Sequence, residues 1–424
     1  MAAIAPARFH SNPHRAETKE HKLILTKSRL PRRQWAILPP MDISDSPTVA
    51  NEHQAVLDLI FSQMPERQNR SSSSWWFFLL FPEGPDGYGP RQLMFTIAAR
   101  AGESMRITDV PLRGIDLNRS IDNGLDRFDA TAVGWYCDGQ TVHDEYIRHA
   151  GPAVLDFTNG SLTCPSNGAN EHRMTFRTPR NGRPALEAEI VGPGGTAEFE
   201  TWGELDAQIS SPVVSMDITT PFGGTHYIGW RRLNFRGRFE LPTGAETLQG
   251  IGFFQRVCLN VPTFPWKWIW ATFPDQTVFT AYVPYLGLNL FRKGYKFFKS
   301  NRLEQATLSV AQSAAWIPPG GAEPVKFNRM AATPVLGRGP HPQFEIAAHN
   351  ERGDHISFTA APYGLSRFFI DRPILGGLVE SHWNYNEYMF RMDDLAGTIG
   401  GRALSRERNG QAYGSLEYTY GLGL

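Results

Sequence analysis

The sequence has little cysteine and no excess of charge of either sign. Its three cysteines, Cys137, Cys164 and Cys258, show no CxxC or Cys/His spacing. An odd number argues against a disulfide framework, so a reducing, cytoplasmic compartment fits the count better than an oxidising one. Basic and acidic residues both number 42. We therefore expect no strongly basic surface that would bind nucleic acid or an anionic membrane.

The sequence also lacks targeting and membrane-spanning segments. Residues 1–22 mix His, Arg, Lys and Glu without the apolar run of a signal peptide. No stretch of about 18 uninterrupted apolar residues occurs, so we expect no integral membrane segment. A basic run at 27–33 is interpreted as part of a solvated arm rather than as a nucleic-acid tag.

Signatures of nucleotide- and metal-dependent enzymes are missing as well. There is no Gly-rich phosphate loop, no GxSxG elbow, no HExxH and no dinucleotide fingerprint. His349 and His355 are separated by loop-like residues, which favours surface groups over metal ligands. We expect neither a metal nor an organic cofactor, and the oligomeric state stays open.

What the sequence does have is glycine, proline and aromatic residues along its whole length. Its 40 Gly and 31 Pro separate short runs rich in aromatic and β-branched residues, for example 75–81, 130–136 and 185–191. Only residues 51–64 show a clear helical periodicity. A chain of 424 residues is expected to form two domains. The pattern therefore predicts an all-β protein with two sandwich or barrel domains and little helix.

The segment 250–287 carries the densest aromatic pattern and predicts a β-hairpin between about residues 266 and 283. If Asp275 and Gln276 form a two-residue loop, Trp270 lies opposite Ala281. Neither face of this hairpin is cleanly polar. We expect both to be covered, one by a core and one by a cavity or a second domain.

Segments from three regions of the chain resemble a known group of proteins. The WWFF strand at 75–78, the segments GIGFFQR at 250–256 and WKW at 266–268, and GSLEYT at 414–419 are similar, in this order, to segments of the AttH and carotenoid 1,2-hydratase group of lipocalin-like proteins. The resemblance implies two consecutive lipocalin-like antiparallel β-barrels. The expected domains are an N-terminal arm with a short helix at 1–70, a first barrel at 71–235 and a second barrel at 236–424.

The resemblance also implies a long apolar ligand of isoprenoid or polyketide type. Relatives in this group hydrate carotenoid double bonds, and fungal ones guide intramolecular [4+2] cyclisations. Where the hydratases have a carboxylate and usually a His, this sequence has Gln255, Arg256 and Val257. Glutamine cannot protonate an alkene, so hydration would require another carboxylic acid. We expect an isomerase or cyclase acting on a small apolar molecule, with alkene hydration or a non-catalytic carrier as alternatives.

The candidate site is expected in a cavity between the two domains. Its proposed catalytic donors and their neighbours are Gln255, Arg256, His226 and Tyr227. The proposed substrate-binding residues are Trp230, Trp266, Trp268, Trp270, Tyr282, His382 and Trp383. Carboxylic acids that could protonate an alkene, if burial raises their pKa, are Glu240, Glu387 and Glu417. Core packing is the alternative interpretation for each tryptophan.

Overall fold

The fold is taken from a computed structural model of the chain. The structure describes residues 60–62, 68–70, 72–85, 87–102, 104–108, 110–165, 171–177, 185–203, 213–220, 223–260, 264–287, 307–319, 323–337, 339–374 and 379–421. All of them belong to one compact unit, Ile37–Leu424. The helix expected at 51–64 lies outside the described residues except for Ile60 to Ser62, of which Ile60 is helical.

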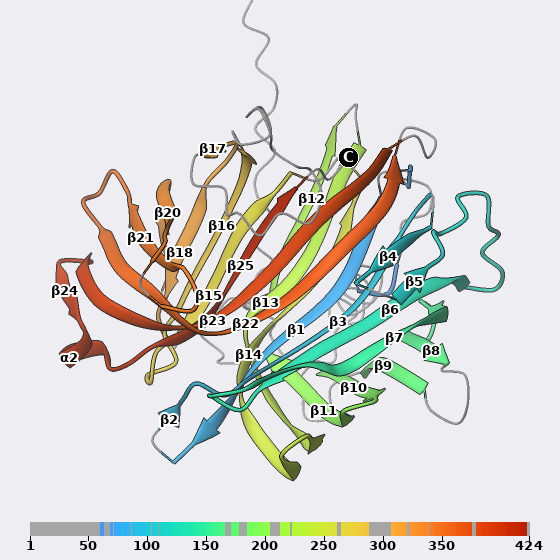
Figure 1. The fold of residues 1–424 in the computed structure, drawn as a ribbon, viewed down its shortest axis with the longest axis horizontal. Helices are drawn as coiled ribbons and strands as arrows, with labels where there is room; N and C mark the ends of the chain where they lie inside the picture. Colours follow the sequence, from blue (N-terminus) through green and yellow to red (C-terminus); the bar gives the residue numbers. More distant parts are fainter. Residues whose placement is uncertain are drawn as a thin grey trace, which may run out of the picture. The chain divides into compact units, whose positions relative to one another are not determined.

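The first sheet has twelve described strands (Figure 1). In chain order they are β1 (Ser73–Gly84), β2 (Gly87–Tyr88), β3 (Gln92–Arg100), β6 (Leu125–Cys137), β7 (Val142–Asp156), β8 (Ser161–Pro165), β9 (Glu171–Arg177), β10 (Ala185–Gly192), β11 (Gly195–Gly203), β12 (Val213–Thr220), β13 (Gly223–Leu241) and β14 (Gly244–Leu259). Neighbours follow the order β11-β10-β9-β8-β7-β6-β3-β1-β14-β13-β12. The additional pairing of β11 with β13 closes this sheet on itself.

The second sheet has thirteen described strands. They are β4 (Met105–Ile107), β5 (Val110–Leu112), β15 (Trp266–Thr272), β16 (Val278–Gly287), β17 (Thr307–Ser309), β18 (Ser313–Ile317), β19 (Val325–Phe327), β20 (Arg329–Val335), β21 (Gln343–His349), β22 (His355–Ile374), β23 (Val379–Ile399), β24 (Arg402–Ser405) and β25 (Tyr413–Gly421). The main path runs β19-β18-β16-β15-β25-β23-β22-β21-β20. A short helix, α2 (Arg406–Asn409), follows β24.

These two curled antiparallel sheets confirm the predicted all-β fold class. The chain leaves the first sheet after Leu259 and enters the second at Trp266. The short strand β4, which lies between strands of the first sheet in the sequence, nevertheless pairs with β22 of the second. Sheet membership therefore does not by itself define the domains, and the limits 71–235 and 236–424 stay a prediction.

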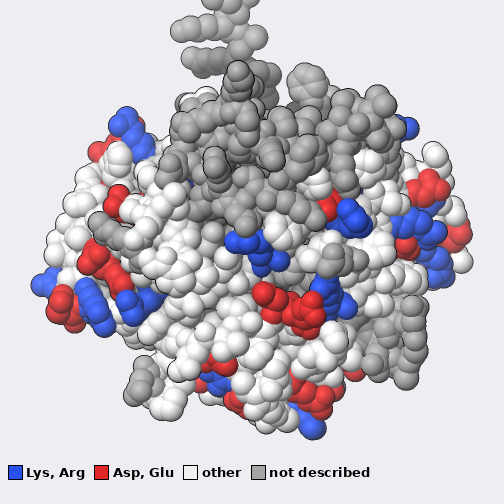
Figure 2. All heavy atoms as spheres, in the orientation of Figure 1, with Lys and Arg blue, Asp and Glu red and all other residues white. Residues whose placement is uncertain are grey.

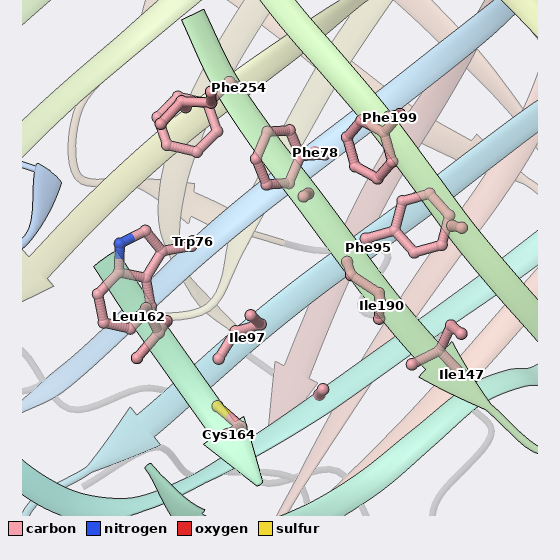
Figure 3. Close-up of a cluster of buried hydrophobic side chains, with 14 of the residues drawn as sticks. Trp76, Phe78, Phe95, Ile97, Ile147, Leu162, Cys164, Ile190, Phe199 and Phe254 are labelled. Atoms are coloured by element: carbon pink, nitrogen blue, oxygen red, sulfur yellow. The ribbon is translucent and has the colours of Figure 1, made fainter. Parts of the chain in front are cut away.

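Three buried hydrophobic clusters explain the apolar runs of the sequence. One fills the first sheet and contains Trp76, Phe78 and Phe254 (Figure 3), and another fills the second sheet. The third, here called the inter-sheet layer, contains residues of both sheets: Phe77, Leu79, Phe81, Tyr88, Met94, Trp135, Cys137, Ile251, Phe253, Trp268, Trp270, Val278 and Met389. Successive residues of a strand point to opposite faces. The continuous apolar run of β1 follows, because both faces of that strand are buried.

The predicted hairpin is present as β15 and β16, but its register differs by one residue. The loop has three residues, because the N–H of Gln276 donates to the carbonyl of Phe273 and Gln276 has φ +65°. Three-residue hairpin loops of this kind combine a type I turn with a following residue in the left-handed conformation, here Gln276. Trp270 consequently lies opposite Thr280 and not opposite Ala281.

That one-residue shift changes which side chains share a face. Ile269 and Ala281 point together into the core of the second sheet. Trp268, Trp270 and Val278 point into the inter-sheet layer. Both faces of the hairpin are covered, as we expected.

The described surface carries charges of both signs. On the face shown in Figure 2, acidic and basic side chains lie among one another and form no large patch of one sign. Among the described residues no helix has the length and apolar character needed to span a bilayer.

Candidate functional site

Two glutamates lie next to each other on the second sheet. Glu387 of β23 is directly opposite Glu417 of β25, and they are 0 % and 3 % exposed. Glu417 is also opposite Trp268 of β15. Since Met389 and Trp268 belong to the inter-sheet layer, alternation places both carboxyls on the face that contacts this layer.

Side chains from both sheets hold the carboxyl oxygens. The indole N–H of Trp135, in the first sheet, donates to Glu387 Oε2, and the Tyr385 hydroxyl donates to Oε1 at 3.1 Å. Trp266 Nε1 donates to Glu417 Oε2 at 2.6 Å. The Tyr385 hydroxyl also interacts with the Glu417 carboxyl and lowers its pKa, against the larger effect of burial. No described residue makes a hydrogen bond of ordinary geometry to the buried Oε1 of Glu417. The site is thus built by both sheets and keeps one acceptor available.

Burial raises the pKa of both carboxyls, and the charge of Glu417 raises that of Glu387 further. Burial, followed by the charge of Glu417, raises the pKa of Glu387 well above its ordinary value. Burial raises the pKa of Glu417 to about 7. Two adjacent buried carboxyls resist simultaneous ionisation. The pair therefore holds at least one transferable proton at neutral pH.

Aromatic rings surround the pair. The ring of Trp266 lies 5.5 Å from that of Trp383 and 5.9 Å from that of Tyr385. Across the inter-sheet layer, Phe253 lies 4.9 Å from Trp268 between ring centroids. Trp266 and Tyr385 are partly exposed, so they mark the accessible edge. Such faces stabilise positive charge that develops beside them.

The structure brings several predicted aromatic residues to this position. Trp266 donates to Glu417, Trp268 lies opposite it, and Trp383 packs on the ring of Trp266. Trp270 lies two residues further along β15, opposite Ser415. Tyr282 pairs with Trp268 but is 45 % exposed. Their roles in substrate binding stay a prediction.

Gln255 and Arg256, predicted as donors of one site, lie on opposite faces of β14. Gln255 is partly exposed and shares the face of Phe253, toward the inter-sheet layer. Arg256 is fully buried on the first-sheet side, 3.7 Å above the ring of Trp76. Strand alternation therefore separates the two side chains, and the catalytic roles of Gln255 and Arg256 stay a prediction.

Arg256 instead ties an upstream segment to the first sheet. Its guanidinium donates to the carbonyls of Ile60 at 3.2 Å and Ser62 at 2.8 Å. We expect Arg256→Ala to lower the free energy of unfolding by roughly 3 kcal/mol, because buried carbonyls lose charged donors. Urea denaturation measures this, with Arg236→Ala, whose side chain is 69 % exposed, as the control. Equal midpoints for both variants would contradict the assignment.

The remaining predicted residues lie apart from the carboxyl pair. Trp230 packs on Phe254 at 5.3 Å in the first core. The backbone of Tyr227 pairs with that of Val257, and the side chain of His226 lies outside the described residues.

His382 is buried on the face of β23 opposite to Glu387, where its Nδ1 contacts Asp371. Arg106 lies 3.4 Å from the same aspartate. Glu240 is exposed at the end of β13, which removes it from the acids considered for alkene protonation.

Two residues of the site were missing from the sequence-based set. Tyr385 could have been found, because it precedes Glu387 by two residues and so shares its face. Trp135 carries no such signal, because its contact joins residues 252 positions apart.

An open pocket of about 560 Å³ lies elsewhere, over β10, β11 and β13. Its lining includes Glu187, Glu189, Glu198 and Glu200, with Arg236 3.4 Å from Glu200. Among the described residues that line it, Phe199 is the one aromatic residue, and the rest are mostly polar or small. Within the described part of the chain, no group of three or more His, Cys, Asp or Glu residues is arranged to hold a metal ion.

Comparison with known proteins gives a likeness of fold at low sequence identity. No family model and no curated protein matches the chain. A putative AttH protein from Nitrosomonas europaea is 12% identical, with 83% of this chain and 93% of that chain covered and a TM-score of 0.46. Kievitone hydratase from Nectria haematococca is 12% identical, with 85% and 93% covered and a TM-score of 0.39.

Proposed function

We propose that the protein is an acid–base enzyme that isomerises or cyclises an apolar alkene through a carbocation. The observation that carries the proposal is the buried Glu387–Glu417 pair among aromatic rings. Gln255 stands where the related hydratases have a carboxylate, and glutamine cannot protonate an alkene. The proton must then come from another carboxylic acid, and we assign this role to the pair. A simple carrier of apolar molecules has no use for two adjacent buried acids, whose desolvation is costly.

The chemistry balances within the pair. The O–H bond of Glu387 breaks and a C–H bond forms at one alkene carbon, which leaves a cation at the other. The carboxylate of Glu417 then removes a proton from a neighbouring carbon, and a new double bond forms. The proton count of the enzyme is restored once a proton returns from Glu417 to Glu387. Attack of a second double bond on the cation before this proton loss gives a ring.

The rings and the indole N–H groups assist these steps. Trp266, Trp268 and Trp383 present faces that stabilise the cation. The N–H of Trp266 stabilises the carboxylate form of Glu417 at 2.6 Å. Because the site is buried, these interactions act at a low local dielectric and are stronger than in water.

Hydration is the second candidate, and it is favoured by the buried Oε1 of Glu417, to which no described residue makes a hydrogen bond of ordinary geometry. A water molecule bound there could attack the cation and lose its proton to this carboxylate. The product would then be an alcohol with the mass of one added water. The same acid would start both reactions, and access of water to the cation would decide between them.

Incubation with a panel of isoprenoid alkenes in deuterium oxide distinguishes these outcomes. We expect a product of altered retention that carries deuterium on carbon, formed by the native chain and not by Glu387→Gln. A gain of one water would instead establish hydration. The matched control is Glu345→Gln, at an exposed position of β21, which should behave as the native chain. Binding without any change in mass, retention or deuterium content would identify a carrier and refute the proposal.

A further inference from the structure

A second polar position lies beside the carboxyl pair on the same face of the second sheet. Ser415 precedes Glu417 by two residues on β25, so both side chains point toward the inter-sheet layer. Ser415 is 1 % exposed, and its Oγ has no hydrogen-bond partner among the described residues. At a strand rise of about 3.4 Å per residue, the two positions are about 7 Å apart.

Gln92 of β3 reaches this position from the first sheet. It is 0 % exposed, and its Nε2 donates to the carbonyl of Gly414 at 2.9 Å, one residue from Ser415. Nε2 also donates to the hydroxyl of Tyr363 at 2.6 Å, and that hydroxyl donates to the carbonyl of Pro90 at 2.7 Å. Gln92 therefore uses both of its N–H groups.

These contacts fix the orientation of the Gln92 amide. If the amide were turned over, Oε1 would face the carbonyl oxygen of Gly414, and two acceptors would meet. The nitrogen must therefore face Gly414. Oε1 is then left buried, without a hydrogen-bond partner among the described residues. A buried acceptor without a donor is costly and rare.

The chemistry of the two unpartnered atoms selects their ligand. Gln92 Oε1 can only accept, so the ligand must donate. The hydroxyl of Ser415 can donate or accept, so it can complete the bonding of the same group. The O–H of an alcohol or phenol matches both atoms chemically, because it can donate to Gln92 and accept from Ser415. A ketone or an ether has no proton to donate to Gln92.

We propose that Gln92 and Ser415 form a subsite for a hydroxyl group of the substrate, about 7 Å from the double bond that reaches Glu387 and Glu417. The substrate class is then a hydroxylated apolar alkene. The position of the double bond rests on the proposed function, whereas binding of the hydroxyl does not. This separation lets one set of probes test the two independently.

The probes are farnesol and farnesyl methyl ether, which share a carbon chain but differ in the O–H group. In the extended farnesol chain, the middle double bond lies at about the required separation from the hydroxyl. Quenching of tryptophan fluorescence measures the affinity of each probe. We expect the native chain to bind farnesol at least about tenfold more tightly, because the ether leaves Gln92 without a donor. Gln92→Met should abolish this preference, and Ser415→Ala should reduce it.

Glu387→Gln separates the two ideas, because it should retain the preference for farnesol while losing any turnover. A preference without turnover in the native chain would count against the proposed function and support the hydroxyl subsite. Equal binding of the two probes by the native chain, or no binding of either, would overturn the subsite. An unchanged preference in Gln92→Met would do the same. If that variant does not fold, an unchanged preference in the smaller change Ser415→Ala decides against the subsite.

Discussion

Glu387→Gln is expected to lower turnover of an alkene substrate by about a hundred- to ten-thousand-fold, the contribution of a positioned general acid. Glutamine has the shape of glutamic acid, and its amide oxygen can still accept from the indole of Trp135. It cannot release a proton. The variant should therefore keep the fold, which circular dichroism checks, while product formation measured by mass spectrometry falls.

The environment of Glu387 is the reason for this expected loss of turnover. Its pKa is raised well above the ordinary value by burial and by the charge of Glu417, so it keeps a proton at neutral pH. Glu345→Gln changes the same atoms at an exposed position and controls for the loss of one carboxylate. Full turnover in Glu387→Gln would remove the pair from the mechanism.

The fold class could be predicted because it depends on local patterns. Short apolar runs bounded by turn residues indicate strands, whether one face of the strand is buried or both. The run at 75–81 predicted a strand, and β1 (Ser73–Gly84) contains it. Its burial on both faces required knowledge of the second sheet, since alternation alone cannot tell which face meets which core.

The register of the hairpin shows how a small local detail propagates. A two-residue loop and a three-residue loop are both compatible with Pro274, Asp275 and Gln276. The positive φ of Gln276 selects the longer one. The extra loop residue shifts the register by one, so Trp268 and Trp270 lie opposite different residues of β16 than expected. The sequence pattern alone does not select between the two loop lengths.

The candidate site was only partly predictable for a different reason. Glu387 and Glu417 could be named as candidate acids, but their contact depends on the register between β23 and β25. Strand β23 also pairs with β22 through two bulges, which no periodicity predicts. Arg256 is next to Gln255 in the sequence, but strand alternation turns its side chain to the other face of β14, against Trp76 in the first core.

Glu417→Gln is expected to stabilise the protein above pH 7 and to remove much of the loss of stability between pH 5 and pH 8. The pKa of Glu417 is raised from an ordinary value of 4.5 to about 7. Below the ordinary value the carboxyl is protonated in both folded and unfolded chains. Between the two values the unfolded chain releases the proton and the folded chain retains it. Stability therefore falls as pH rises through this range.

The raised pKa of Glu417 corresponds to roughly 3 kcal/mol of stability lost by about pH 7. Glutamine does not titrate, so the variant escapes this part of the loss, whereas Glu387 continues to contribute in the same direction. Urea denaturation at pH 5 and pH 8 measures both chains, and Glu345→Gln should follow the native slope. The same slope in Glu417→Gln as in the native chain would mean that this carboxyl ionises normally. A pair that ionises normally could not hold the proton that the proposed chemistry requires.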